Sequence, residues 1–225
     1  MGQRGWNDPG PFGGRSKVKR SYTVCHKDKW LLAINKPCGL PTQSTRDGGE
    51  NLFDLLRNRN DYVGLHHRLD TPASGLVLFT INRAANPGIA EGFRTHSIER
   101  RYEIVVVGNP GESGVWETDI DGKNARSHWT RQASAGGMSV LEVHLETGRT
   151  HQIRRHAADN GHPVVGDRRH GGAASRLWPR LALHAAGLSL IHPMTDQPLS
   201  LQAPLPEDVS ALWARVHPRP DTQAP

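Results

Sequence analysis

The chain is built from short apolar runs separated by turn-forming residues. Three of these runs, at residues 30–35 (WLLAIN), 75–81 (GLVLFTI) and 102–107 (YEIVVV), have the length of buried strands. Residues 140–146 alternate apolar and polar side chains, as a half-buried strand does, and residues 181–190 resume strand character. With 24 glycines and 16 prolines available for turns, the pattern predicts a β-rich domain.

Helical patterns are fewer. Residues 51–57 (NLFDLLR) predict a short amphipathic helix, and residues 150–160 (THQIRRHAADN) predict a second one. Thr150 can cap the start of the second helix, and Gly161 can end it in the left-handed conformation. Arg154 is expected at the edge of its apolar face. Many strands with few helices favour an α+β fold with mainly antiparallel pairing.

Both ends of the chain lack periodicity, so residues 1–20 and 217–225 are expected to be disordered tails. Residues 21–216 contain no repeat, linker or composition break and are expected to form one domain. No apolar run approaches the ~18 residues of a membrane span, and the N-terminus lacks a secretory signal. We therefore expect a soluble, cytoplasmic protein. Cys25 and Cys38 have no metal-type spacing and are expected to stay reduced.

Basic residues are concentrated in two places. The formal net charge is +6, and residues 1–20 contribute +4 through five basic residues against one acid. Residues 149–180 hold seven arginines against two aspartates, together with several histidines. Charge as local as this suggests a polyanion partner such as nucleic acid, although a run of charge is more often a solvated surface.

Three segments carry residues suited to chemistry. In residues 67–75 (HRLDTPASG), Asp70 lies in a turn before an apolar strand, where it can act chemically or simply cap the turn. Tyr102 follows two arginines and can be an ordinary strand aromatic. In residues 147–154 (TGRTHQIR), the arginines can hold phosphates, pair with a carboxylate, or lie solvated at the surface.

Taken together, these motifs resemble one family. HRLDxxxSG, ERRY, TGRTHQIR and GHPVVGD follow one another in the order typical of the RluA-type RNA pseudouridine synthases, with INKPCG before them. The resemblance spans about residues 21–210 and implies a mixed, mainly antiparallel sheet with flanking helices and a central catalytic cleft. Ala73 stands where the family usually has threonine, and no segment resembles the S4-type RNA-binding domain that many relatives carry.

The resemblance also implies roles for individual residues. Asp70 corresponds to the nucleophile, which attacks either the sugar or the uracil ring, with the sugar route preferred. Arg154 corresponds to its basic partner, and Tyr102 to an aromatic that stacks on the base and helps remove the C5 proton. Arg68 would enter the space left by a flipped base. The remaining expected RNA contacts are His67, Arg149, His151 and Gln152.

The implied reaction is an isomerisation, so no cofactor or metal is expected, and the 13 histidines are interpreted as RNA contacts or surface residues. The expected partner is rRNA or tRNA, and the expected state is a monomer. The principal alternative is a catalytically silent RNA-binding relative that assists RNA folding. A carboxylate hydrolase, which needs two cooperating carboxylates, and a structural ribonucleoprotein component rank lower.

Overall fold

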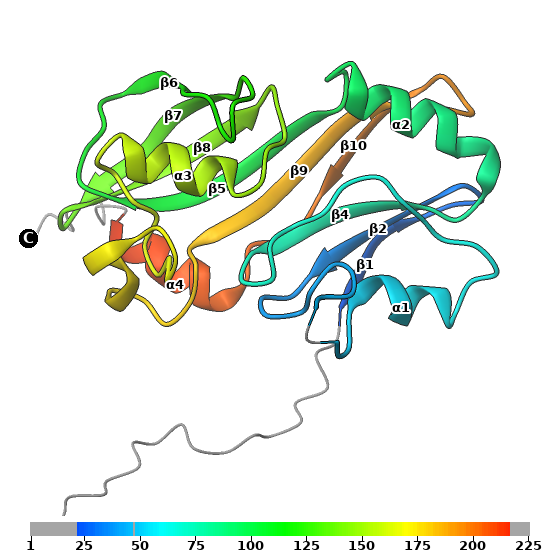
Figure 1. Ribbon diagram of the computed structural model, residues 1–225, viewed down its shortest axis with the longest axis horizontal. Coiled ribbons are helices and arrows are strands. Elements are labelled where there is room, and N and C mark those ends of the chain that lie inside the picture. The colour runs from blue at the N-terminus through cyan, green and yellow to red at the C-terminus, as the bar shows by residue number, and fades with distance from the viewer. Residues whose placement is uncertain (1–21, 47, 217–225) are drawn as a thin grey trace, which may run out of the picture.

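The described part of the chain, residues 22–46 and 48–216 of a computed structural model, forms a ten-stranded sheet flanked by helices (Figure 1). The expected tails at 1–20 and 217–225 lie outside the described residues. The strands are β1 (Thr23–Lys27), β2 (Leu31–Lys36), β3 (Gly64–Leu65), β4 (Ser74–Thr80), β5 (Glu99–Val107), β6 (Ser113–Glu117), β7 (Arg126–Ala135), β8 (Met138–Leu145), β9 (Leu183–Ile191) and β10 (Pro198–Gln202). The helices are α1 (Leu52–Arg57), α2 (Asn86–Arg94), α3 (Gln152–Asp159) and α4 (Glu207–Val216), with 3-10 turns η1 (Arg83–Ala85) and η2 (Gly172–Arg176).

The strands lie in the order β1-β2-β4-β9-β5-β8-β7-β6, with β3 beside β4 and β10 beside β9. Among the described strand pairs, β4 and β9 are parallel and the others are antiparallel. The sheet is therefore mixed and mainly antiparallel, and the expected α+β class is confirmed.

The parallel contact between β4 and β9 is short and close. It pairs Ser74 with His184 and Gly75 with Ala185. Gly75 has φ +115°, and a Cβ there would lie 2.3 Å from the Ala185 carbonyl oxygen. A residue with a side chain cannot occupy this position without moving the strands apart. The junction lies in the middle of the sheet, directly after the turn that carries Asp70.

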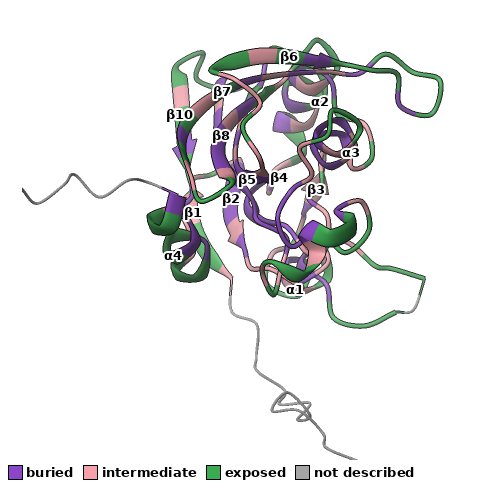
Figure 2. Cartoon of the chain, turned by 90° about the vertical axis from the view of Figure 1, so that its left-hand side faces the viewer, coloured by how far each residue is buried: buried purple, intermediate pink, exposed green. Residues whose placement is uncertain are grey.

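The central strands are buried on both faces, which explains their continuous apolar runs. On one face of β2, Ile34 packs in a cluster with Leu56 of α1, and on the other Leu31 packs with Ile89 of α2. Farther along the sheet, α3 and α4 lie on opposite sides of β7 and β8 (Figure 2). No helix among the described residues is long and apolar enough to cross a membrane.

Most expected elements are present, with one error in helix capping. The five predicted strands correspond to β2, β4, β5, β8 and β9, and the two predicted helices to α1 and α3. Asn51 caps α1 by accepting a hydrogen bond from the Asp54 N–H. Thr150 does not cap α3, because the capping position is His151, which has φ +56° and makes no side-chain cap bond. Both cysteines are free, as expected.

Candidate active site

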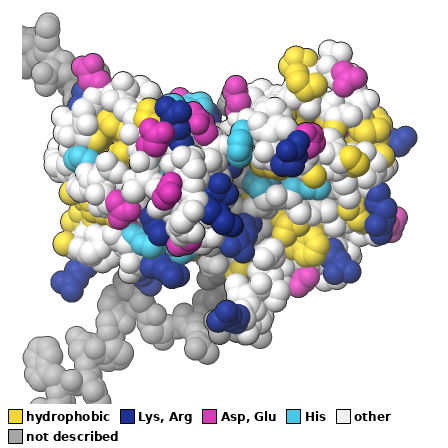
Figure 3. All heavy atoms as spheres, turned by 45° about the horizontal axis from the view of Figure 1, so that its top comes forward, with side chains coloured by type: hydrophobic (Ala, Val, Ile, Leu, Met, Phe, Trp, Pro, Cys, Tyr) yellow, Lys and Arg dark blue, Asp and Glu magenta, His cyan; other side chains and the backbone are white. Residues whose placement is uncertain are grey.

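Three adjoining cavities lie in the region of the Asp70 turn. Their volumes are about 880, 730 and 70 Å³, and Arg68 and Asp70 border all three. On the face drawn in Figure 3, arginine, lysine and histidine side chains gather along the hollow in the middle of the molecule. The expected central cleft is thus present, and its walls are rich in positive charge.

The turn that carries Asp70 is fixed from behind by the INKPCG segment. Lys36 is fully buried, and its ammonium donates to four backbone carbonyls, among them those of Thr71 (3.4 Å) and Ala73 (2.6 Å). Thr42 exchanges hydrogen bonds with the backbone of Leu69 through its hydroxyl. Because these contacts immobilise the chain on both sides of Asp70, its carboxylate has a defined direction.

Arg154 reaches Asp70 across 84 residues of sequence. Its Nη1 donates to Asp70 Oδ2 at 2.7 Å. The Arg154 side chain is 5% exposed and that of Asp70 is 26% exposed, so the cation is buried whereas the carboxylate opens on the cleft. The sequence placed Arg154 at the edge of the helix face; it lies inside because its partners are buried. The expected pairing of these two residues is present in the structure.

The residue that sequence reasoning missed is Asp167. Its carboxylate accepts from Arg154 Nε at 2.8 Å and Nη2 at 2.7 Å, in a bidentate pair. The backbone N–H groups of Arg169 and His170 also donate to it. Burial alone would raise the pKa of Asp167, but these hydrogen bonds lower it to about 2. Asp167 therefore stays ionised and fixes the guanidinium that holds Asp70.

The carboxylates of Asp70 and Asp167 together stabilise the positive charge of Arg154. Burial opposes the charge of the guanidinium, but the hydrogen bonds to Asp167 and Asp70 raise the pKa of Arg154. The arginine thus remains a cation in the protein interior, with two of its nitrogens committed to one acid and a third to the other. We call this arrangement of Asp70, Arg154 and Asp167 the fork. Of its two carboxylates, that of Asp70 is the one accessible to a substrate.

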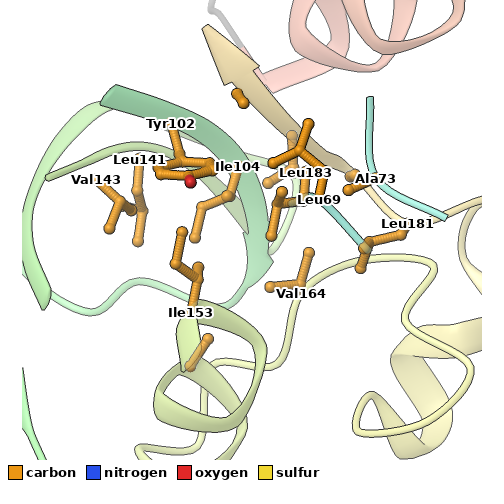
Figure 4. Packing of buried hydrophobic residues seen from close by; sticks show 14 of the residues in the cluster. Leu69, Ala73, Tyr102, Ile104, Leu141, Val143, Ile153, Val164, Leu181 and Leu183 are labelled. Atoms are coloured by element: carbon orange, nitrogen blue, oxygen red, sulfur yellow. The ribbon is translucent and has the colours of Figure 1, made fainter. Parts of the chain in front are cut away.

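Tyr102 forms a wall of the smallest cavity. It lies 8% exposed on β5, in a packed group with Ile104, Leu141 and Ile153 (Figure 4). The same cavity is bordered by Asp70 and Arg154. Burial and the negative charge of Asp70 raise the pKa of Tyr102, against the lowering effect of Arg100. A slot bordered by an aromatic ring, aliphatic side chains and a carboxylate suits a pyrimidine base.

His151 lies beside Asp70 and His170. Its Nε2 is 3.7 Å from Asp70 Oδ2, and its Nδ1 is 2.9 Å from His170 Nε2. Burial chiefly lowers the pKa of His151, although Asp70 raises it in part. Neutral at ordinary pH, this histidine offers the cleft a polar edge without a second fixed charge.

Gln152 is a correction to the expected RNA contacts. The residue is 3% exposed, and its amide is fully used inside the protein. Its oxygen accepts from Thr147 Oγ1 and the Arg149 N–H, while its nitrogen donates to the Arg126 carbonyl and Ser127 Oγ. Gln152 therefore ties the start of α3 to β7 and has no group left for RNA.

The other residues expected to contact RNA border the cleft but differ in exposure and charge. Arg68 is exposed, and Arg149 is half-buried with its Nε donating to the Asn124 carbonyl. His67 stacks on Phe93 and accepts a hydrogen bond from the Leu78 N–H. Burial, followed by the charges of Arg100 and His66, lowers the pKa of His67 to about 3. His67 is thus a neutral wall residue, whereas Arg68 and Arg149 present charge.

Several histidines are structural, contrary to the interpretation that all are surface residues or RNA contacts. His156 and His184 are fully buried. His156 bonds Ser127 and the Thr118 carbonyl, and His184 bonds Ser74 and the Ala203 carbonyl. Within residues 22–46 and 48–216, no group of three or more His, Cys, Asp or Glu side chains is arranged to hold a metal ion.

Comparison with known proteins places the chain among RNA-modifying enzymes. A model of the family described as RNA pseudouridylate synthase matches residues 30–159. The chain is 34% identical to tRNA pseudouridine synthase C of Salmonella typhi, over 86% of this chain and 87% of the relative. It is 32% identical to ribosomal large subunit pseudouridine synthase D of Xanthomonas campestris, over 86% and 69%. The solved structure of human RNA pseudouridylate synthase domain containing 1 shares the fold, with a TM-score of 0.73, 23% identity and 92% of each chain covered.

Proposed function

The chain belongs to the RNA pseudouridylate synthase family, and from that premise we propose that Asp70 is the nucleophile with which it converts a uridine of tRNA or rRNA to pseudouridine. The reaction breaks the C1′–N1 bond of the nucleotide and forms a C1′–C5 bond. The C5 proton is lost and N1 gains one, so no oxidant, reductant or other co-reactant enters the balance.

The observation that supports this role is the Asp70–Arg154 ion pair on the border of the slot beside Tyr102. The guanidinium donates a hydrogen bond to the carboxylate and fixes its direction. In the proposed route the carboxylate attacks C1′ of the ribose, and the uracil leaves as an anion that turns within the slot. Reattachment through C5 then displaces the carboxylate.

Tyr102 has two proposed parts in this sequence. Its ring stacks on the base, and its oxygen helps remove the C5 proton. The negative charge of Asp70 is one cause of the raised pKa of Tyr102. Reattachment through C5 releases Asp70 as a carboxylate before the C5 proton is removed, so the tyrosine oxygen would act in this step beside that negative charge.

The target nucleotide must leave the RNA stack to reach the slot, at a cost of a few kcal/mol. Arg68 is exposed and borders all three cavities, so we propose that it occupies the space vacated by the base. Arg149 and His151 are proposed to meet the adjacent backbone, with His67 as part of the wall. We also propose a monomer that acts in the cytoplasm.

The decisive variant is Asp70→Asn, which keeps the shape of the side chain and removes the nucleophile. We expect no detectable pseudouridine on RNA that the native protein converts, with RNA affinity and thermal stability nearly unchanged. The matched control is Asp121→Asn, since Asp121 is an exposed acid that pairs with Arg155; it should retain turnover. Full activity of Asp70→Asn would reject Asp70 as the nucleophile, whereas no turnover by the native protein would favour the silent RNA-binding alternative.

The RNA itself is identified by mapping pseudouridine across total RNA from cells with and without the protein. One relative is named for tRNA and another for the large ribosomal subunit, and we propose that the target lies in one of these RNA classes. A modification that disappears in the deletion strain, and returns with the native chain but not with Asp70→Asn, defines the substrate. An unchanged map would contradict the proposed activity in those cells.

A further inference from the structure

Arg100 is a buried cation that the described part of the chain does not pair with a carboxylate. It is 8% exposed, and its Nη2 donates to the carbonyls of Leu145 (3.2 Å) and Glu146 (3.1 Å). Its Nε is buried without a hydrogen-bond partner. Burial lowers the pKa of Arg100. Removing a charge from water without an opposing charge is costly, so a buried and unpaired guanidinium needs an explanation.

The neighbouring arginine shows the ordinary arrangement. Arg101 points to the other side of β5, where its Nη1 donates to Glu103 at 2.8 Å and to Glu142 at 3.4 Å. The two adjacent arginines therefore differ in kind: one is neutralised by two carboxylates on the strand surface, and the other enters the protein and meets backbone oxygens alone.

The guanidinium of Arg100 lies against the 730 Å³ cavity. Both Arg100 and Gly148 border that cavity. A Cβ built at Gly148 would lie 2.7 Å from Arg100 Nη1, so the absence of a side chain at 148 leaves this edge of the guanidinium uncovered. The position of the cation is thus set by the strand, and its approach is kept open by the glycine.

The cavity is suited to an anion. Four arginines line it, at 68, 94, 100 and 149, and among its lining residues Asp70 is the one carboxylate, already held by Arg154. The cavity also shares Tyr102 with the proposed uridine slot. An anion bound here would therefore lie next to the reacting nucleotide.

We propose that Arg100 anchors a phosphate-binding subsite that takes a phosphodiester group of the RNA strand flanking the target uridine. The proposal rests on the proposed function. Guanidinium groups match phosphate oxygens with two parallel hydrogen bonds, and a phosphate supplies the negative charge that the surrounding protein does not. Held on one side of Tyr102 by this contact, the strand would present its extruded base to Asp70 on the other.

The first test asks whether Arg100 contributes one phosphate contact to RNA binding. RNA affinity is measured by fluorescence anisotropy as a function of salt, using a labelled RNA hairpin with one loop uridine that the native protein converts. Arg100→Gln should weaken binding and lower the slope of log K against log salt by about 0.7 to 0.9, the value of one phosphate. Arg101→Gln, which removes the same charge from the opposite side of β5, should leave the slope unchanged. An unchanged slope in Arg100→Gln would overturn the proposal.

A second arm locates the phosphate. Hairpins carrying one uncharged methylphosphonate linkage at a time are compared on native protein and Arg100→Gln. We expect one linkage beside the uridine whose replacement weakens binding to the native protein at least several-fold and has no further effect on Arg100→Gln. Equal losses on both proteins at every linkage would make Arg100 a structural tie between β5 and the turn after β8.

A third variant guards against a folding defect in Arg100→Gln. Gly148→Ala retains the arginine and its charge but places a methyl group against Nη1, and it should reduce affinity at the same linkage. Unaltered RNA binding by a folded Gly148→Ala would contradict the proposal that the phosphate approaches Arg100 past Gly148. Conversion of the unmodified hairpin by the native protein tests the proposed function independently, because it needs no phosphate replacement.

Discussion

At the scale of single residues, the sequence indicated the proposed catalytic groups through their motifs but could not supply the distances between them. Asp70 and Arg154 are 84 positions apart, and nothing in the periodicity of either segment brings them together. Asp167 was visible in the GHPVVGD motif without a role, because its function depends on Arg154 being buried. A basic residue within the apolar part of a helix does carry that signal, since a buried cation calls for an acid.

The first prediction concerns this fork. Asp167→Asn removes the charge that fixes Arg154, so Asp70 loses its defined aim. We expect kcat to fall by about ten- to a hundredfold with a smaller change in KM. Unfolding free energy should drop by ~1.5–3 kcal/mol, the range for hydrogen bonds to charged groups. The control Asp208→Asn breaks a bidentate pair with Arg180 in which the acid is 48% exposed, and should cost less than ~1 kcal/mol.

The same pair gives a pH dependence of stability. The pKa of Asp167 is lowered in the folded protein from its ordinary 3.8 to about 2. Its contribution is therefore complete above about pH 4 and is lost as pH falls toward 2. Urea midpoints of the native protein and Asp167→Asn should differ at neutral pH and converge in this acid range. A constant difference down to pH 2 would show that the carboxylate charge is not what stabilises the fork.

At the scale of elements, the buried strands and the alternating strand β8 were predictable, whereas the largely polar strand β7 was not. β2 and β4 are covered on both faces, so their sequences are continuous apolar runs. β7 buries alternate residues only in part and carries polar side chains over most of its length. The alternation of apolar and polar residues that marks a strand is therefore weak in its sequence. The start of α3 was misplaced for another reason. Its N-cap residue, His151, has a positive φ and makes no side-chain cap bond. A non-glycine residue with positive φ cannot be recognised from the sequence alone.

A further prediction tests the junction of β4 and β9. Gly75→Ala places a methyl group 2.3 Å from the Ala185 carbonyl oxygen, so β4 and β9 must separate and the turn carrying Asp70 must move. We expect a loss of stability of more than ~2 kcal/mol and a large fall in turnover. Gly136→Ala in the turn after β7 is the control, since Gly136 also has positive φ but nothing within 4 Å. It should cost about 1 kcal/mol, measured by urea unfolding; equal losses would assign the effect to backbone conformation alone.

At the scale of the whole molecule, the order of the strands could not be obtained from local patterns. β4 pairs with β9 across more than a hundred residues and joins two halves of one sheet. Such pairings depend on the packing of the entire domain, because each strand alone could pair with several others. The motif order indicated the family and through it the fold, whereas composition and periodicity reached only a β-rich α+β class.

The last prediction concerns the charge of the complete chain. Residues 1–20 hold four of its six net positive charges, whereas the proposed catalytic residues all lie within residues 22–216. Removing residues 1–20 should therefore weaken RNA binding, most clearly at low salt, and reduce the salt dependence of affinity, while kcat at saturating RNA stays within about twofold. Replacing the five basic residues of the segment by glutamine should reproduce the effect if charge is its cause. A truncated protein that binds RNA normally but no longer forms pseudouridine would instead place this segment in the catalytic site, and the cleft described above would then be incomplete.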